Sequence, residues 1–411
     1  MNSKKTHLSN LPKSNKFIPD WALLAIIFAL LPAFLLIQGC EKEEEKPVEK
    51  DPVVLDCDYF ETDRVLEDDP NRPVDYVVTC VAQVDGDIVI KAGVVIEFQD
   101  DAGLYVDDGS LKVEGSSSAK VVFTGMNKVK GSWRGIFFES IKTSNSLEYA
   151  VVSYAGGNSF NVFDDKANIV IFNGAKVNIN NCEINNSKEH GISSLYRNCE
   201  ISSFSNNIIT GNDKYPVVSL TEYGHMYSNT NSFTGNGIDF IFLDGSYEIR
   251  GERMWEKNNV PYLIEGWVYI VENQSLTIMA GAQLFFEDQG SIYIHKGGYL
   301  FVDGSDSELV LLSGQVAQPG SWLGIYNGSG DLRNVINYAE IAYAGGGQHN
   351  VFGDLGTIVC GSNTYTKVTN TYMRDADQLA ECAINAPRAD DEVVVENNTL
   401  SGIAHEVCDA D

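Results

Sequence analysis

Short alternations of apolar and polar residues run along most of this 411-residue chain. Segments such as 94–98, 111–115 and 177–184 place apolar side chains at every second position, and Gly, Asn, Asp and Ser separate them. This pattern is typical of short, half-buried β-strands joined by frequent turns. Beyond the first forty residues no stretch keeps an apolar period of 3.6 residues. The sequence therefore predicts an all-β fold with few helices.

The chain contains a long internal duplication. The octet GSWRGIFF begins at Gly131 and returns as GSWLGIYN at Gly320, an offset of 189, and four further segments recur at the same offset. An upstream segment recurs at an offset of 188. Similarity kept in register over about 100 residues indicates that a whole structural unit is duplicated. We therefore expect Trp133 and Trp322 to be structural residues of matching turns.

An Asn-rich tract at 178–237 decides between two all-β architectures, a sandwich or barrel and a solenoid. Its pattern of Asn, apolar residue and turn repeats from His190 to Tyr215 and again from Tyr215 to Ile238, at offsets of 25 and 23. Such spacing matches one solenoid turn. Asn tolerates left-handed backbone angles at corners, and stacked Asn side chains can hydrogen-bond from turn to turn. We expect a parallel β-solenoid of about 14 turns, spaced by ~4.8 Å.

The two copies open on similar segments, YVVTCVAQVDGDIVIKAGVVIEF at 76–98 and YLIEGWVYIVENQSLTIMAGAQLFF at 262–286. Each is followed by L-x-V-x-G, a strand ending near F-T, and W-x-G-I, so that the order covers about 74–160 and 260–350. This order resembles right-handed parallel β-helices of the pectin lyase-like superfold. The resemblance implies that fold. It also implies an enzyme class that cuts acidic polysaccharides, either with Ca²⁺ and an Arg or Lys base or with clustered Asp residues.

The first forty residues predict export. Four Lys precede an apolar run at 21–37, which ends at Gly39 and Cys40. A basic stretch, an apolar stretch and a small residue describe a secretory signal, and the ending resembles the lipobox of bacterial lipoproteins, in which Cys40 is lipidated. The alternative is an uncleaved membrane anchor, because an apolar run of this length just spans a bilayer. Acidic residues after Cys40 resemble the export tag of Gram-negative surface lipoproteins and imply the outer face of the outer membrane, with the periplasmic side as the alternative.

These patterns divide the chain into a signal peptide at 1–39, a lipidated Cys with an acidic tether at 40–72, and solenoid segments at 73–250 and 251–411. Removal of the signal, which carries four Lys and one Asp, takes the formal charge from −28 to −31. So acidic a chain repels phosphate backbones, which excludes a nucleic-acid partner. The same charge favours Ca²⁺ or cationic partners.

Seven of the eight cysteines remain after lipidation, an odd number for an oxidising compartment. Cys182 and Cys199 share the tetrapeptide NCEI and would meet on stacked turns, either as a disulfide or as buried thiols. The other expected pairs are Cys57 with Cys80 and Cys360 with Cys382, with Cys408 left free.

Four acidic pairs are candidates for metal ligands or catalytic carboxylates: Asp100/Asp101, Asp107/Asp108, Asp164/Asp165 and Asp390/Asp391. The first two pairs flank a short strand, where corner carboxylates usually form turns. Their alternative role is a Ca²⁺ site, which needs six to eight oxygens and hence further ligands. Asp164 matches Gly353 in the repeat. At most one copy could therefore hold a catalytic pair, and turn formation is the favoured interpretation.

Basic and histidine candidates are few. Arg134 has Leu323 at its equivalent position, so the repeat does not need a base there and Arg134 is free for a functional role. The alternative is an exposed Arg on an outward strand face. His190 and His349 have no metal-binding pattern around them and are expected at solvated or turn positions.

Tyr residues alternate through segments such as 291–301 and 324–327. Those that point outward would stack on sugar rings, unless they simply suit an exposed β-surface. Because no complete catalytic set is present, we expect a non-catalytic surface protein that binds a glycan or matrix component. One alternative is a polysaccharide lyase or glycoside hydrolase that acts on acidic polysaccharides, which rests on the fold-level resemblance. Another is a structural spacer.

Overall fold

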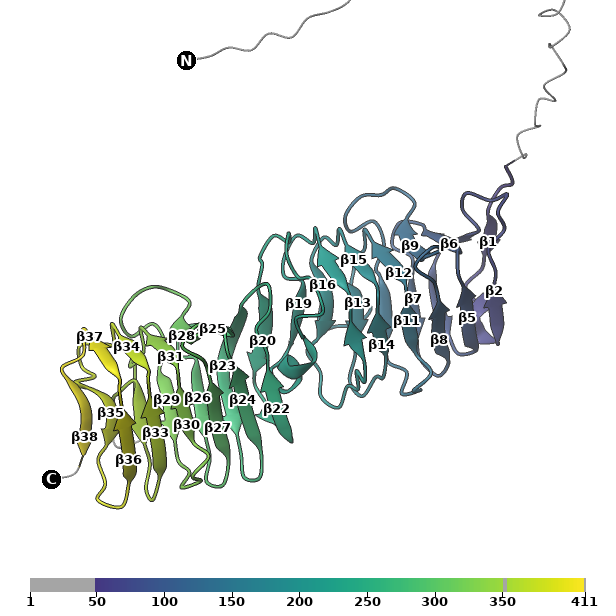
Figure 1. Cartoon of the computed structure of the whole chain (residues 1–411). Helices are drawn as coiled ribbons and strands as arrows, with labels where there is room; N and C mark the ends of the chain where they lie inside the picture. Colours follow the sequence, from purple (N-terminus) through teal and green to yellow (C-terminus); the bar gives the residue numbers. More distant parts are fainter. Residues whose placement is uncertain (1–48, 350–352, 410–411) are drawn as a thin grey trace, which may run out of the picture. The chain divides into compact units, whose positions relative to one another are not determined.

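The computed structural model describes residues 49–349 and 353–409, which form a parallel β-solenoid (Figure 1). The pairs between its numbered strands are parallel, and the described helices are two short 3₁₀ segments, η1 (Tyr59–Glu61) and η2 (Thr221–Met226). The prediction of an all-β solenoid with few helices is confirmed. No helix in these two ranges has the length and apolar character needed to cross a membrane.

Three sheets run along the first copy. Sheet A contains β1 (Val53–Leu55), β3 (Tyr76–Val78), β6 (Val95–Phe98), β9 (Val121–Gly125), β12 (Ala150–Ser153), β15 (Glu183–Asn185) and β18 (Ile208–Thr210). Sheet B contains β2 (Arg64–Leu66), β5 (Asp87–Lys91), β8 (Ser110–Glu114), β11 (Ser146–Glu148), β14 (Asn178–Asn180) and β17 (Phe204–Ser205). Sheet C begins with β4 (Val81–Val84), β7 (Gly103–Val106), β10 (Ile136–Phe138), β13 (Ala167–Ile171), β16 (His190–Ser194), β19 (Val217–Leu220) and β20 (Ile241–Gly245).

The second copy extends sheet C and adds two sheets. Sheet C continues through the first half of β23 (Tyr262–Ile270) into β25 (Gln283–Phe286), β28 (Val310–Gly314), β31 (Ala339–Ala342), β34 (Tyr372–Arg374) and β37 (Thr399–Ser401). Sheet D contains β22 (Glu252–Trp255), β24 (Ser275–Met279), β27 (Tyr299–Asp303), β30 (Val335–Asn337), β33 (Tyr365–Thr369) and β36 (Glu392–Glu396). Sheet E contains β21 (Glu248–Ile249), the second half of β23, β26 (Ser291–Ile294), β29 (Gly324–Asn327), β32 (Ile358–Cys360), β35 (Cys382–Ala386) and β38 (His405–Asp409).

Corresponding strands of the two copies lie in different sheets at the junction. β1 begins at Val53 and β20 at Ile241, while β2 begins at Arg64 and β22 at Glu252, so both pairs keep an offset of 188. β1 belongs to sheet A, whereas β20 pairs with β19 of sheet C. The second copy therefore stacks directly on the first but starts one sheet further around the coil. Because β20 also pairs with β23, the two copies form one continuous stack.

The repeated tryptophans occupy equivalent core positions. Trp133 stacks on Phe98 with ring centroids 4.1 Å apart, and its Nε1 donates a hydrogen bond to the Ser153 backbone oxygen at 2.8 Å. Trp322 stacks on Phe286 at 4.4 Å, and its Nε1 donates to a backbone oxygen at the same distance of 2.8 Å. Each Trp is fully buried. The octet recurs because each copy needs the same ring in the same turn.

Asn residues hold the corners, as the sequence predicts. Asn181, Asn186 and Asn206 have positive φ of 56–57°, the left-handed region that Asn tolerates. Elsewhere in the tract, the Asn212 side chain accepts a hydrogen bond from Asn168 at 3.1 Å and donates one to Asn236 at 2.8 Å. The amides thus connect successive turns.

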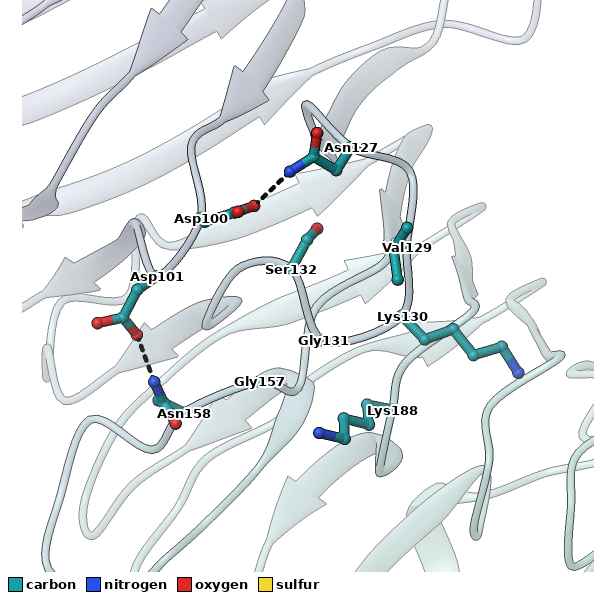
Figure 2. A pocket seen from close by; sticks show the side chains of 10 residues that line it. All are labelled: Asp100, Asp101, Asn127, Val129, Lys130, Gly131, Ser132, Gly157, Asn158 and Lys188. Atoms are coloured by element: carbon teal, nitrogen blue, oxygen red, sulfur yellow. Dashed lines mark hydrogen bonds between the residues drawn. The ribbon is translucent and has the colours of Figure 1, made fainter.

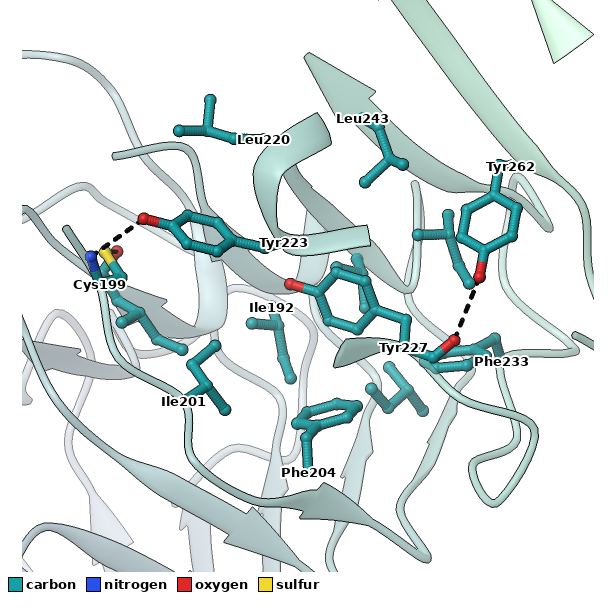
Figure 3. Packing of buried hydrophobic residues seen from close by; sticks show 14 of the residues in the cluster. Ile192, Cys199, Ile201, Phe204, Leu220, Tyr223, Tyr227, Phe233, Leu243 and Tyr262 are labelled. Atoms are coloured by element: carbon teal, nitrogen blue, oxygen red, sulfur yellow. Dashed lines mark hydrogen bonds between the residues drawn. The ribbon is translucent and has the colours of Figure 1, made fainter. Parts of the chain in front are cut away.

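Buried tyrosines fill the interior where the two copies meet (Figure 3). Tyr223, on η2, accepts a hydrogen bond from the backbone N–H of Cys199 at 3.0 Å. Tyr262 donates to the Tyr227 backbone oxygen at 3.3 Å, and the Tyr227 hydroxyl donates to Ser219 at 2.9 Å. Because buried hydroxyls need partners, these bonds allow the large rings to close the junction without unpaired oxygens.

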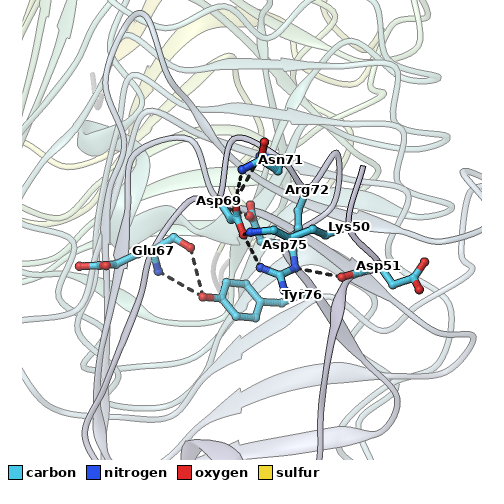
Figure 4. Close-up of polar contacts among 8 residues, drawn as sticks. All are labelled: Lys50, Asp51, Glu67, Asp69, Asn71, Arg72, Asp75 and Tyr76. Carbon is cyan, nitrogen blue, oxygen red and sulfur yellow. Dashed lines mark hydrogen bonds and ion pairs between the residues drawn. The ribbon is translucent and has the colours of Figure 1, made fainter. Parts of the chain in front are cut away.

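The solenoid begins earlier than expected. The sequence assigned 40–72 to a lipidated Cys and an acidic tether, but β1 and β2 lie within this range. Figure 4 shows the polar contacts at this end: Asp69 pairs with Lys50 at 2.7 Å and with Arg72 at 2.5 Å. The Asp75 carboxylate, only 1 % exposed, accepts backbone N–H bonds from Asp69 and Val95. Buried hydrogen bonds of this kind fix the first turns. The expected lipidation site Cys40 lies outside the described residues.

Candidate functional site

An aromatic ladder lies on the outward face of sheet E. It consists of Trp267 and Tyr269 on β23, Tyr293 on β26 and Tyr326 on β29. Because side chains alternate along a strand, the Val and Ile neighbours of these rings point into the core. Tyr293 is in register with Tyr269 and with Tyr326, at ring-centroid distances of 6.1 and 4.4 Å. The rings therefore contact one another from turn to turn.

Trp267 begins the ladder and is held in one orientation. Its indole Nε1 donates a hydrogen bond to the Gln289 backbone oxygen at 2.9 Å. One face of the ring stacks on Tyr293, with centroids 5.3 Å apart and planes 15° apart. One turn earlier the neighbouring residues are Gly245 and Ser246. The Trp267 side chain is half-buried and borders a hollow beside these small residues.

This hollow has a volume of about 540 Å³. Two carboxylates, three small residues and the first two rings of the ladder line it: Asp244, Gly245, Ser246, Glu265, Gly266, Trp267 and Tyr269. Asp244 on β20 and Glu265 on β23 are direct register partners. The Ser246 backbone N–H donates to Asp244 Oδ1 at 2.7 Å and keeps that carboxylate at the rim. Among residues 49–349 and 353–409, neither carboxylate forms an ion pair.

A third carboxylate extends this row. Glu287 follows β25 at the position next to Glu265, since Ile264 and Phe286 are register partners. Burial, and then the negative charge of Glu265, raise the pKa of Glu287 above its usual value. The row of acidic side chains is therefore a region of like-charge repulsion.

His349 lies against the ladder. It is only 6 % exposed, its ring centroid is 6.0 Å from Tyr326, and its Nε2 is 3.1 Å from the Leu323 backbone oxygen. Its Nδ1 is 3.3 Å from the Ser291 hydroxyl. Burial lowers the pKa of His349 to about 4, so the ring is neutral at physiological pH. The solvated or turn position was expected for His349: the residue lies in a bend, but its side chain is buried beneath the aromatic face.

Comparison with known proteins gives no family for this chain. No family model matches it, and neither a curated protein nor a solved structure is similar to it. Its function must therefore be inferred from the geometry of the site.

A second hollow, of about 580 Å³, contains the first acidic candidates (Figure 2). Asp100 accepts a hydrogen bond from Asn127 at 2.7 Å, and Asp101 accepts one from Asn158 at 2.9 Å. Arg134 pairs with Asp101 at 2.8 Å and donates from Nη1 to the Ser159 backbone oxygen at 2.7 Å. These side chains connect loops to one another. We therefore assign them a structural role, and Arg134 joins two corners of the solenoid.

The other acidic pairs are also engaged at corners. Asp164 has a positive φ of 62° and pairs with Lys166 at 2.7 Å, while Asp165 accepts hydrogen bonds from Asn161 and Tyr196. Burial, followed by the charge of Asp108, raises the pKa of Asp107. Asp391 accepts hydrogen bonds from the backbone N–H and hydroxyl of Thr364, at 3.1 and 2.8 Å. In the described part of the chain, no three His, Cys, Asp or Glu side chains gather in a group that could hold a metal ion.

His190 lines a third hollow, of about 430 Å³, on sheet C. Its ring stacks on Tyr215 with centroids 5.7 Å apart, and Tyr215 contacts Phe242 at 5.2 Å. Burial lowers the pKa of His190 to about 4. His190 was expected at a solvated or turn position, but it begins β16 and its uncharged imidazole packs on the aromatic side chains of sheet C.

The cysteines pair only partly as expected. The structure contains disulfides between Cys57 and Cys80 and between Cys382 and Cys408. The expected pairing of Cys360 with Cys382 and the free Cys408 are therefore wrong, because β38 stacks on β35 and brings Cys408 next to Cys382. Three buried thiols stay free: Cys182, Cys199 and Cys360. Burial raises the pKa of Cys182 and of Cys199 to about 12, as for small apolar core residues.

The sequence indicated part of the ladder but not the hollow. Tyr293 and Tyr326 belong to the alternating Tyr segments that were expected to point outward. Trp267 and the carboxylates Asp244 and Glu265 were missed. A usable signal was present in YLIEGWVYI at 262–270, where Trp and Tyr alternate shortly after a Glu.

Proposed function

We propose that this protein is a non-catalytic glycan-binding protein whose ligand packs on Trp267. The observation that carries the proposal is the fixed indole, which has one face on Tyr293 and borders a hollow with carboxylates at its rim. Sugar rings present apolar faces that pack on aromatic rings, and their hydroxyls donate to carboxylates. A platform of this kind needs no nucleophile or general acid. The 540 Å³ volume is within the range of small-ligand sites.

A glycan microarray tests the proposal with the purified full chain kept in mild detergent. We expect binding to a restricted set of glycans and a loss of at least about tenfold in affinity for Trp267→Ala, the size expected from one aromatic contact. Phe163→Ala is the matched control, because Phe163 is an aromatic side chain that is 65 % exposed in the first copy. Absence of binding to every glycan, or equal binding by Trp267→Ala, would contradict the proposal. Release of shortened or unsaturated sugars would favour the lyase or hydrolase alternative.

We also propose that the chain belongs to the right-handed, pectin lyase-like β-helices and is displayed as a Gram-negative surface lipoprotein anchored through Cys40. The support is the order of turn motifs and the Gly-Cys ending of the apolar run. Metabolic labelling with a fatty-acid analogue tests the anchor: the wild-type chain should be labelled and Cys40→Ala should not. Labelling of both would contradict lipidation at Cys40.

A further inference from the structure

We infer that the hollow beside Trp267 binds a sugar that carries a positive charge, namely an amino sugar with a free amine. This inference rests on the proposed glycan binding and specifies its ligand class. The ammonium group would lie between Asp244 and Glu265, beside the indole.

The two carboxylates create a local excess of negative charge. Asp244 and Glu265 are register partners on adjacent strands, where side chains are ~5 Å apart at Cβ and like charges repel. The pKa of the adjacent Glu287 is raised, in part by Glu265. No Lys, Arg or His in the described ranges is ion-paired with Asp244 or Glu265. A cation placed between them would relieve this repulsion.

The aromatic wall favours an organic cation over a metal ion. Indole is the best side-chain partner for an ammonium group through its π-face, and an aromatic ring does not ligate Ca²⁺. The Trp267 ring cannot turn away, because Gln289 and Tyr293 hold it. The 540 Å³ hollow also has room for a sugar ring, far more than an ion needs. A uronate would be repelled by the same carboxylates.

The first copy keeps one residue of this set, since Asp56 occupies the place of Asp244, but it lacks the others. By strand register, Thr79 occupies the place of Glu265, and Gln99 occupies that of Glu287. Val81 occupies the place of Trp267. Residues needed by every turn recur in both copies, whereas these three differ together. Their joint replacement by Glu265, Glu287 and Trp267 points to ligand binding.

The test compares two oligosaccharides of equal length, a hexamer of glucosamine and its fully N-acetylated form, by titration calorimetry against the full chain in detergent. Acetylation removes the positive charge and leaves the sugar backbone. We expect the free amine to bind about tenfold more tightly. The double variant Asp244→Asn/Glu265→Gln should lose this preference but still bind the acetylated form, and Trp267→Ala should weaken both.

A charge-matched control is needed because the whole protein is acidic. Asp306→Asn/Glu272→Gln removes two exposed carboxylates outside the hollow and should keep the preference. Equal binding of the two hexamers by the wild-type chain would overturn the inference and leave the proposed function standing. A preference that persists in Asp244→Asn/Glu265→Gln, or that vanishes in the control, would also overturn it. Failure to bind either hexamer, together with a blank glycan array, would overturn both.

Discussion

The same outward face carries a different cluster of rings in each copy. Tyr105 on β7 and Phe137 on β10 occupy the places of Tyr293 and Tyr326. In the first copy Phe160 packs on both rings, at 6.3 and 5.3 Å, and Phe137 is only 2 % exposed. The second copy has His349 where the first has Phe160, and its ring lies 6.0 Å from that of Tyr326. Tyr105, Tyr293 and Tyr326 are all half-buried. One scaffold thus supports either an apolar cluster or a more polar row of tyrosines and histidine.

The ion pair and the hydrogen bond of Arg134 explain much of this difference. Arg134 joins Asp101 to the loop that carries Phe160. At the equivalent positions the second copy has Leu323 and Gln289, which cannot form an ion pair. Some inward positions, by contrast, recur unchanged, as the two tryptophans show. Selection for packing acts on the inside of each turn, and the outside is free to diverge.

The largest effect is expected from the inward tryptophans. Trp322→Ala and Trp133→Ala should each reduce the free energy of unfolding by about 3–5 kcal/mol, because each removes a fully buried ring and its hydrogen bond. Trp267→Ala, on the outward face, should change it by less than about 1 kcal/mol. Urea unfolding followed by circular dichroism measures all three. A loss below about 1 kcal/mol for Trp322→Ala would refute the structural role of the repeated octet.

The next effect concerns the residue that distinguishes the two faces. The pKa of His349 is lowered to about 4, while an unfolded His titrates near pH 6.5. Between these values only the unfolded chain takes up the proton, so stability is lost as the pH falls from about 6.5 to 4. His349→Phe installs the first copy's residue and should reduce that loss by about 2–3 kcal/mol.

Unfolding curves at several pH values, compared between wild type and His349→Phe, measure this difference. His190 and His225 also have pKa values lowered to about 4 by burial, so some pH dependence will persist. The exposed His405 serves as the control, as His405→Phe. Parallel pH profiles for wild type and His349→Phe would show that His349 is not held neutral beneath the ladder.

The fold could be predicted from the sequence because its signals are local. The repeated octet, the apolar alternation and the Asn corners each depend on a few neighbouring residues. The hollow could not be predicted in this way. The surroundings of Trp267 depend on which residues stack next to it one turn earlier, and Gly245 and Ser246 are there because β20 pairs with β23. The pairing of Cys382 with Cys408 depends on stacking in the same way.

The smallest expected effect on stability comes from removing the contacts of Arg134. Arg134→Leu installs the second copy's residue and removes an ion pair with Asp101 and the hydrogen bond to Ser159. The Arg134 side chain is partly exposed, so the free energy of unfolding should fall by only about 1 kcal/mol. Backbone amides at 157–166 should exchange with solvent about tenfold faster, because the loop loses its attachment. Leu323→Arg is the control, since Gln289 offers no charge and no ion pair should form in the second copy. If amide exchange at 157–166 is unchanged in Arg134→Leu, the packing of Phe160 on the neighbouring rings is enough to hold this loop in place.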